Sequence, residues 1–310
     1  MDTHKISAWI SRQDQIDRYA IPVQRTIAKL FGAEGKAMKN VEQFLHGRWL
    51  GHPLHSILVH IPVGAWTLAA IFDLFGRSAA TRGAADWAIG IGLVMAIPAM
   101  LTGSTDWYPY DNAAVRRIGF VHMCANWAAF ILYGISLALR TGNDYFGALF
   151  TGSLAFACLL ASGYLGGVLV YEKRVGVNHA NEPEEEVQLN EFVPVILLAN
   201  LVENTPVRLQ VLENWIVVVK SRSRVFALAD KCSHEGGDLS KGTVVAGCLE
   251  CPWHATQFRL EDGQVVGGPG VFPQPVFDVA IEDGWVMVKA VRAVEPLRSS
   301  APIVNQVSLM

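Results

Sequence analysis

Two cysteines and two histidines in the second half of the chain have the types and spacing of metal ligands. Cys232 and His234 stand in the run C-S-H, and sixteen residues later Cys251 and His254 stand in the run C-P-W-H. Each run can present one thiolate and one imidazole from a single tight loop. Two such loops facing each other hold a [2Fe–2S] cluster, with both thiolates on one iron and both imidazoles on the other. A zinc site is the alternative, but zinc ligand pairs are usually separated by two to four residues, and C-x-H leaves only one.

The segment around these four residues resembles the Rieske family. The resemblance rests on KCSHEGGDL (231–239), CPWHATQF (251–258) and FRLEDGQVVGGPG (258–270). It implies that Cys232, His234, Cys251 and His254 bind a [2Fe–2S] cluster, and that the stretch Gly267-Gly268-Pro269 forms a third loop that caps it. It also implies that the two imidazoles face the protein surface, where electrons leave.

The chain departs from the quinol-oxidising members of that family at several positions. Gly237 and Trp253 stand where those members carry two further cysteines, so no disulfide joins the two loops here. Thr256 and Phe258 stand where they carry a Ser and a Tyr whose hydroxyl groups donate to sulfur. Because such hydrogen bonds raise the potential, we expect a midpoint in the lower part of the roughly −150 to +300 mV Rieske range. Ala255 replaces the usual Gly after the last ligand.

Composition indicates a membrane protein and excludes several functions. Hydrophobic residues make up 51% of the 310 residues, and the excess lies in the first 175. The net charge of −3 provides no basic surface for nucleic acid. With five cysteines, at least two of them on metal, no disulfide framework is expected, which fits a reducing compartment.

Four segments are long and apolar enough to span a bilayer, which needs about 20 residues each. They are residues 54–74, 87–105, 119–139 and 147–171. We therefore predict a membrane all-α four-helix bundle, preceded by short amphipathic helices in the polar first 46 residues.

The same region resembles a bacterial four-helix membrane domain of unknown function. The resemblance rests on GRWLGHPLHSILVHIPVGAWT (47–67), TGSTDW (102–107) and GYLGGVLVYEKRVGVNHA (163–180). Domains of this type occur fused to C-terminal Rieske modules, so the resemblance extends to the two-part architecture.

Basic residues predict the orientation of the spans. The positive-inside rule places Lys- and Arg-rich segments in the cytoplasm. The N-terminal segment, the loop after the second span and the exit of the fourth span are basic, and the opposite ends have few basic residues. Both termini and the Rieske domain are therefore expected on the cytoplasmic side of a bacterial inner membrane.

His60 and His122 predict a second, more speculative cofactor site. Each lies about six residues into a span that begins on the cytoplasmic side, or roughly 9 Å at the helical rise. Two imidazoles at matching depth could ligate a haem b between helices. The structural alternatives are a hydrogen bond between the two rings, or contacts with Asp106 or Trp107. Asp106 and Asp73, at opposite ends of the bundle, are expected to meet interfacial water.

Two other histidines, His52 and His55, stand just before the first span. The simplest role for them is to cap the helix or to bond to neighbouring backbone.

The remaining chain predicts an all-β Rieske-type antiparallel barrel or sandwich. Short strand-like runs, punctuated by Gly, Asn and Asp, are residues 193–199, 207–211, 215–220, 224–229, 276–281 and 285–291. The predicted division is a polar amphipathic segment (1–46), a four-helix transmembrane domain (47–179), an acidic linker (180–190), the Rieske domain (191–292) and a tail (293–310).

The function expected from these features is one-electron transfer between a membrane donor, a quinol or haem partner, and a cytoplasmic acceptor protein. One alternative is a tethered ferredoxin that serves a separate oxygenase or reductase. The other is a redox sensor in which cluster state gates the helices. No catalytic residue is predicted, because no second iron site of the 2-His-1-carboxylate type follows His254. The sequence therefore indicates an electron carrier or oxidoreductase component rather than a stand-alone catalyst.

Overall fold

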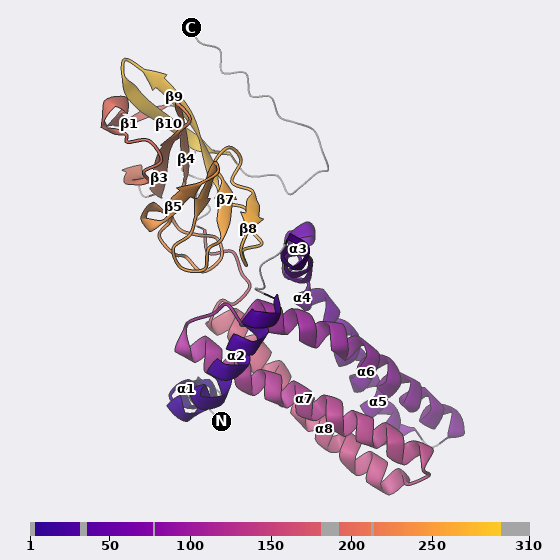
Figure 1. Cartoon of the computed structure of the whole chain (residues 1–310). Coiled ribbons are helices and arrows are strands. Elements are labelled where there is room, and N and C mark those ends of the chain that lie inside the picture. The colour runs from indigo at the N-terminus through magenta and orange to yellow at the C-terminus, as the bar shows by residue number, and fades with distance from the viewer. Residues whose placement is uncertain (1–3, 32–35, 77, 181–191, 212–213, 293–310) are drawn as a thin grey trace.

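The chain forms a helical part and a β part, with the β part at one end of the helices (Figure 1). The computed structural model describes residues 4–31, 36–76, 78–180, 192–211 and 214–292. Nearly all of the predicted linker and the whole predicted tail lie outside the described residues. The predicted class, an all-α four-helix bundle followed by an all-β antiparallel domain, is confirmed.

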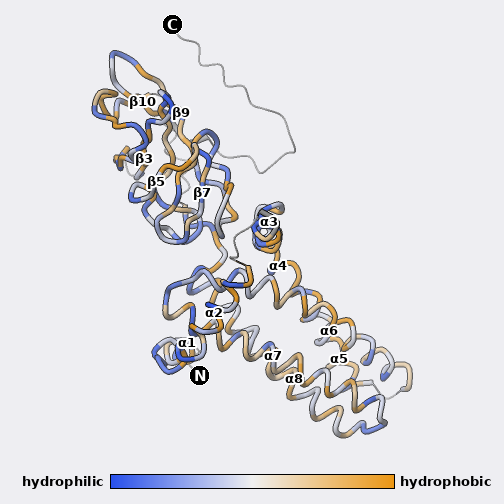
Figure 2. Tube along the Cα trace, in the orientation of Figure 1, coloured by the Kyte–Doolittle hydropathy of each residue, from blue (hydrophilic) through white to orange (hydrophobic). Residues whose placement is uncertain are grey.

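The helical part contains four long apolar helices and several shorter ones. The helices are α1 (His4–Ser11), α2 (Asp17–Phe31), α3 (Lys36–Leu45), α4 (His55–Leu58), α5 (His60–Phe75), α6 (Ala79–Trp107), α7 (Ala113–Thr141) and α8 (Tyr145–Gly167), with a π-helical turn, η3 (Val168–Glu172), after α8. Four helical stretches, α4 with α5, α6, α7, and α8 with η3, are long and apolar enough to cross a membrane. Figure 2 shows their hydrophobic residues along most of their length.

The second and third apolar helices are longer than predicted. Each has 29 residues, which is about 43 Å at the helical rise and exceeds a hydrocarbon core of about 30 Å. Helix α6 begins early because Ser78 and Thr81 form a reciprocal capping box, in which each backbone N–H donates to the other side chain at 3.1 Å. The capped, polar first turns extend the helix beyond its apolar stretch.

Helices α5 and α6 pack as one hairpin and α7 and α8 as another (Figure 1). At the end far from the β part, the buried Arg140 joins them. It donates to Asp73 Oδ2 at 2.5 Å and to Asp86 Oδ1 at 3.1 Å. The expectation that Asp73 only meets interfacial water is therefore wrong, because this carboxylate is an ion-pair partner. Helices α5, α6 and α7 are thus tied by charge at their far end.

The N-terminal helices pack against the opposite end of the bundle. Helices α1 and α2 contact α7, and Asp17 accepts from Arg116 Nε at 2.9 Å and from Arg117 Nη2 at 2.7 Å. The two arginines hold the pKa of Asp17 at about 2, against the opposing effect of burial. The predicted amphipathic segment is therefore anchored to the bundle by charge.

The β part consists of two antiparallel sheets. One has the order β1-β10-β9-β4-β3-β2 and the other the order β5-β6-β7-β8. The strands are β1 (Val193–Leu197), β2 (Val207–Val211), β3 (Asn214–Ser221), β4 (Arg224–Ala229), β5 (Thr243–Val245), β6 (Cys248–Glu250), β7 (Gln257–Arg259), β8 (Val265–Gly267), β9 (Val276–Glu282) and β10 (Trp285–Arg292). The six-stranded sheet contains the six predicted strands. The four three-residue strands of the smaller sheet were not predicted.

The predicted ligands lie in two loops, one after a strand of the larger sheet and one within the smaller sheet. Cys232 and His234 follow β4, and Cys251 and His254 lie in the turn between β6 and β7. Both cysteines belong to one buried cluster that includes Phe258. The two ligand loops are therefore built on a packed core, and their tips point toward the helical part (Figure 1).

Candidate functional site

The structure brings the four predicted ligands together as two pairs. Cys232 and Cys251 pack in one buried cluster, and the rings of His234 and His254 have centroids 5.1 Å apart. Among the described residues, no three His, Cys, Asp or Glu side chains converge on one point as a mononuclear site requires. One sulfur pair beside one nitrogen pair is the arrangement that two irons with different ligand sets need.

The two ligand loops have the same backbone hydrogen bonds. In the first, Gly236 N–H donates to Cys232 O at 2.8 Å; in the second, Ala255 N–H donates to Cys251 O at 3.1 Å. Gly236 and Ala255 both have positive φ, +75° and +53°. The turn therefore requires the left-handed region after each ligand pair, which explains why the family usually has Gly where this chain has Ala255.

The chemistry of these side chains fits a [2Fe–2S] cluster. His254 Nδ1 is buried and has no hydrogen-bond partner among the described residues, so a ring nitrogen is available for iron. The Cys232 thiol and the N–H groups of Trp253 and His254 lower the pKa of Cys251 to about 7 against burial, whereas the Cys251 thiol and burial raise the pKa of Cys232. Burial, together with the neighbouring His254, lowers the pKa of His234 to about 3. A thiolate and neutral imidazoles are the protonation states that bind iron.

The two imidazoles face the helical part and not the open surface, so the expectation that they face the surface is wrong. The ring of His234 lies 5.5 Å from that of Tyr110. His254 Nε2 lies 3.4 Å from Glu235 and 3.8 Å from Asp111. Tyr110 and Asp111 belong to the turn between α6 and α7, which covers the ligand edge of the β part.

Two further side chains hold the loops in place. The buried Gln274 side chain accepts from Ser233 N–H at 3.0 Å and donates to Ala229 O and Lys231 O at 2.7 Å each. Its amide therefore ties the first ligand loop to the end of β4. From the helical part, Arg48 Nη2 donates to Gly268 O in the third loop at 2.7 Å. Burial lowers the pKa of Arg48 to about 10, so the guanidinium is still charged at neutral pH.

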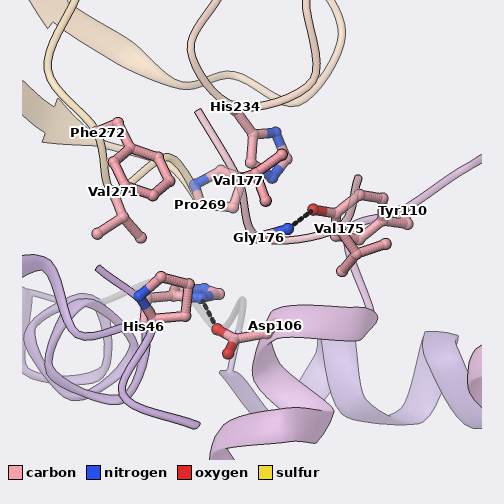
Figure 3. Close-up of a pocket in the computed structure, with 11 residues that line it drawn as sticks. His46, Asp106, Tyr110, Val175, Gly176, Val177, His234, Pro269, Val271 and Phe272 are labelled. Carbon is pink, nitrogen blue, oxygen red and sulfur yellow. Dashed lines mark hydrogen bonds and ion pairs between the residues drawn. The ribbon is translucent and has the colours of Figure 1, made fainter. Parts of the chain in front are cut away.

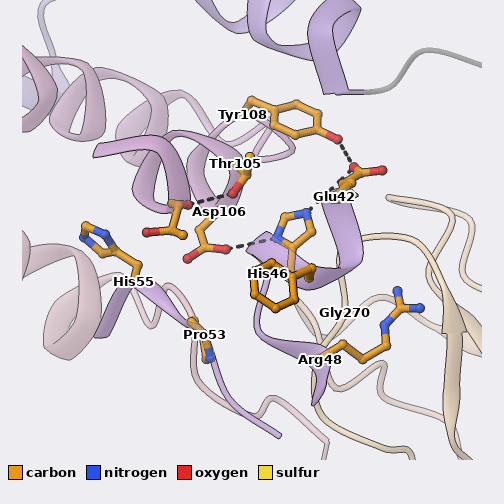
Figure 4. A network of polar contacts seen from close by, with 12 residues as sticks. Glu42, His46, Arg48, Pro53, His55, Thr105, Asp106, Tyr108 and Gly270 are labelled. Atoms are coloured by element: carbon orange, nitrogen blue, oxygen red, sulfur yellow. Dashed lines mark hydrogen bonds and ion pairs between the residues drawn. The ribbon is translucent and has the colours of Figure 1, made fainter. Parts of the chain in front are cut away.

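A buried polar network lies directly below the ligand edge (Figure 4). His46 Nδ1 and Asp106 Oδ1 are 2.9 Å apart, and Glu42 Oε1 lies 3.7 Å from His46 Nε2 and accepts from the Tyr108 hydroxyl. Asp106 and Glu42 raise the pKa of His46 although burial opposes this. Asp106 was expected to meet interfacial water and is instead paired with a base. Sequence reasoning missed His46, because its partner lies 60 residues away.

A small cavity of about 30 Å³ connects this network to the ligands. Figure 3 shows His46 and Asp106 on one side of it and His234 on the other, with Tyr110 beside them. The volume is enough for water. The helical part therefore places the His46–Asp106 pair across a small cavity from one predicted ligand.

The two predicted haem ligands, His60 and His122, line one cavity of the helical part, and each ring already contacts a backbone carbonyl. His60 is exposed, and its Nδ1 contacts Ile57 O at 3.3 Å. In His122, Nδ1 contacts Ser162 O at 2.9 Å and Nε2 contacts Asn126 Nδ2 at 3.1 Å, so both ring nitrogens are engaged. Neither ring bonds to the other or to Asp106. His52 bonds to neighbouring backbone, as its simplest role predicts, whereas His55 reaches across to helix α6.

The geometry and the sequence together define a class of protein, an iron–sulfur domain joined to a helical domain. Residues 51–179 match the family described as a predicted membrane protein, DUF2231. Residues 191–278 match the Rieske [2Fe-2S] domain. The chain belongs to the Rieske family through its C-terminal domain and carries the DUF2231 domain before it, so the predicted fusion is confirmed, and the β part implies a [2Fe–2S] cluster.

The relatives named here match between about a quarter and a third of this chain. The anthranilate 1,2-dioxygenase ferredoxin subunit of Burkholderia cepacia is 32% identical over 103 residues, which are 33% of this chain and 95% of that protein. Human apoptosis-inducing factor 3 is 36% identical over 75 residues, and the match spans only 12% of its length. A solved ferredoxin of the carbazole 1,9a-dioxygenase from Nocardioides aromaticivorans shares 27% identity with a TM-score of 0.32, over 32% of this chain and 98% of its own.

Proposed function

We propose that Cys232, His234, Cys251 and His254 hold the [2Fe–2S] cluster, and that the protein carries single electrons from a membrane donor to a soluble acceptor. A cluster of this kind takes up and gives up one electron at a time. The core around Cys232 and Cys251 excludes water from the sulfur side. Backbone N–H groups of His234 and Glu235 point at one sulfur and those of Trp253 and His254 at the other, and they stabilise the added negative charge.

The observation that carries this proposal is the contact between His234 and Tyr110. A cluster ligand packs on the turn that joins two apolar helices, 5.5 Å between ring centroids. A freely tethered ferredoxin needs no such contact, because its ligand edge has to meet a partner. The covered edge therefore favours access of electrons from the helical domain.

The exposed side of the second ligand loop is the proposed exit for electrons. Trp253 lies next to His254, has 57% of its surface exposed, and packs beside Gly237 of the first loop. An exposed aromatic residue is a frequent anchor in protein interfaces. The ferredoxin relatives are named as parts of dioxygenases, so an oxygenase or reductase component is the proposed class of acceptor.

We place the Rieske domain on the cytoplasmic side of a bacterial inner membrane. The β part lies at the end of the helices where Arg116 and Arg117 begin α7 (Figure 1), and positive residues favour the cytoplasm. A reporter fused after Met310 that is active only in the cytoplasm is the expected result. Activity only outside the cytoplasm would reverse this placement.

The membrane donor is proposed to be a quinol. The alternative, a haem b between His60 and His122, would require His122 to give up its bond to Ser162 O or to Asn126, and the comparisons do not support haem. A pyridine haemochrome spectrum of protein from haem-replete cells tests it, and b-type bands would restore the haem donor.

A matched cysteine pair tests the core of the proposal. Dithionite-reduced wild-type protein should show the rhombic EPR signal of a Rieske cluster and should reduce a soluble one-electron acceptor stoichiometrically. Cys251→Ser should lose both properties, whereas Cys248→Ser, three residues earlier on β6, should keep them. Protein isolated without oxygen that contains zinc, or neither iron nor sulfide, would overturn the assignment.

A further inference from the structure

The helical domain encloses a second, much larger cavity. Its volume is about 600 Å³, and it lies between the two helix hairpins at the end nearest the β part. Its lining is mostly apolar, with a few polar groups, among them His55, Asp106, His122 and Asn126. A mostly apolar pocket of 300 to 1,000 Å³ with a few placed polar groups is typical of a small-molecule site.

The mouth of the cavity opens sideways, where a membrane would be. Val63 on α5 and Val170 and Tyr171 on η3 line the cavity and are exposed, Tyr171 by 89%. These residues lie on two of the stretches long and apolar enough to cross a membrane. A π-helical turn of this kind is frequent at functional sites. A ligand that enters here comes from the lipid phase.

Two glycines let histidine rings reach the cavity wall. A Cβ on Gly103 would lie 2.7 Å from the ring of His55, and one on Gly166 would lie 3.2 Å from the ring of His122. His55 Nδ1 contacts Ala99 O at 2.8 Å. Because a carbonyl only accepts, Nδ1 carries the proton and Nε2 of the neutral ring keeps its lone pair. Among the described residues, no hydrogen bond to His55 Nε2 is found, so this nitrogen can accept from a ligand hydroxyl.

Asp106 belongs to both cavities. Together with Pro53, Val175 and Gly176, it lines the large cavity and the small one that reaches His234. Its partner His46 is only 2% exposed, and the Nε2 of His46 has no hydrogen-bond partner among the described residues. Figure 3 shows this pair across the small cavity from His234. One side of the pair therefore faces the large cavity and the other faces a predicted cluster ligand.

We propose that the large cavity binds an isoprenoid quinol, with its head group between His55 and Asp106 and its tail leaving through the mouth beside Val63. This inference rests on the proposed function. It adds the site, the substrate class and the groups that receive the protons.

The proposed chemistry balances. Oxidation of one quinol to the quinone breaks two O–H bonds and releases two protons and two electrons. The protons go to His55 Nε2 and to the Asp106 carboxylate, which is paired with His46 beside the small cavity. The two electrons leave one at a time, by way of the Rieske domain, to two molecules of a soluble one-electron acceptor. No further oxidant is required.

Binding can be tested without any electron transfer. The full chain in detergent, with and without its cluster, is photolabelled with an azido-ubiquinone that has a short alkyl tail. Gly163 lines the cavity, and a Cβ there meets no atom within 4 Å. Because the first side-chain atom has room, Gly163→Phe should narrow the cavity and reduce labelling at least fivefold. Gly134→Phe is the matched control, because Gly134 on α7 has equally open surroundings away from the cavity.

The labelled peptides should come from α5, α6, α7 and the end of α8. Equal labelling of wild type and Gly163→Phe, or labels spread over the outer faces of the helices, would refute the site. Recovery of a tightly bound phospholipid in place of quinone in the purified wild-type protein would also refute it.

A second pair of variants tests the proton acceptor. Asp106→Asn should slow anaerobic cluster reduction by a low-potential naphthoquinol such as menadiol at least tenfold while the dithionite-reduced EPR signal stays unchanged. Asp86→Asn removes an ion-paired carboxylate at the far end of the bundle. In this variant quinol should reduce the cluster as fast as in wild type. An unchanged rate of cluster reduction in Asp106→Asn would exclude this carboxylate as a proton acceptor.

The experiments can refute the quinol site and the carrier function independently of each other. A protein that passes electrons from dithionite to the soluble acceptor but takes up no azido-quinone refutes the quinol site and leaves the carrier function intact. A protein that is labelled in the cavity but reduces no soluble acceptor refutes the carrier function and keeps the site.

Discussion

Phe258 lies in the buried core with both ligand cysteines, at the position where quinol-oxidising relatives carry a Tyr. Its ring is fully buried and has no donor for sulfur. Thr256, at the neighbouring position, uses its hydroxyl to accept from Gly270 N–H at 3.2 Å. The cysteine sulfurs therefore rely on backbone N–H groups for stabilisation.

Phe258→Tyr should raise the reduction potential by an amount on the order of tens of millivolts, because a hydroxyl donor to sulfur favours the reduced cluster. An EPR-monitored redox titration measures this change. Phe226→Tyr, at the edge of the same core, is the control and should leave the potential unchanged. An equal or lower potential in Phe258→Tyr would contradict the explanation.

Ala255→Gly should stabilise the Rieske domain. Ala255 has φ of +53° where the equivalent Gly236 of the first loop has +75°, and the left-handed region costs a residue with a Cβ about 1 kcal/mol. The midpoint temperature of thermal unfolding should therefore rise by a few degrees. The greater flexibility that Gly gives the unfolded chain reduces this gain. A lower midpoint would show that the loop holds Ala255 without strain.

At the scale of elements, the ligand loops depend on side chains that are distant in sequence. Gln274 makes three hydrogen bonds to the segment from Ala229 to Ser233. The N-terminal helices depend on Asp17 in the same way, through Arg116 and Arg117. In both cases one polar side chain fixes where a whole segment lies.

Gln274→Met should destabilise the Rieske domain by about 2–4 kcal/mol, because it leaves buried backbone groups of the first loop without partners. The protein should also lose iron faster during chelation. Chemical unfolding and the rate of cluster loss measure the two effects. Gln210→Met, on the exposed face of β2, is the control, and equal behaviour of the two variants would refute the role of Gln274.

The Asp17 contact should make stability depend on pH. The folded-state pKa of Asp17 is about 2 and lies below its usual value, so the contact contributes fully above about pH 5 and is lost as pH falls from about 4 to 2. With solvent screening, its contribution is on the order of 1 kcal/mol. Wild type should therefore be more stable than Asp17→Asn at pH 7, and the difference should vanish near pH 2. A difference that is constant with pH would exclude the ion pair as its source.

At the scale of the whole molecule, the two domains meet at the ligand edge. Arg48 bonds to the third loop, Tyr110 packs on His234, and Asp111 lies near His254. All three residues come from the helical domain. The arrangement holds the proposed cluster close to Asp106 and to the large cavity.

Arg48→Ala should loosen this contact without unfolding either domain. It removes one charged hydrogen bond to Gly268 O, which contributes about 1.5–3 kcal/mol. Hydrogen exchange should rise in the 267–270 loop, and quinol-dependent reduction should slow while the dithionite-reduced EPR signal stays the same. Arg259→Ala, which removes an exposed ion pair with Asp262, is the control. Unchanged exchange would show that Arg48 does not hold the domains together.

The sequence predicts the ligands and the helices because their signals are local. Cys232, His234, Cys251 and His254 are recognised by spacing, and the spans by continuous apolar length. The strands β5 to β8 have three residues each, too short for an alternating pattern to be seen. His46, Tyr110 and Arg48 could not be assigned roles, because their partners lie 60 to 220 residues away or depend on how two domains dock.

The ion pairs of Arg140 have a mechanical consequence. Asp73, Asp86 and Arg140 bind α5, α6 and α7 to one another at the far end of the bundle, and separating a buried pair costs several kcal/mol. The two helix hairpins are therefore held together at their far end and can separate only at the opposite end. A ligand that enters from the membrane has to enter at that opposite end, where the Rieske domain contacts the helices.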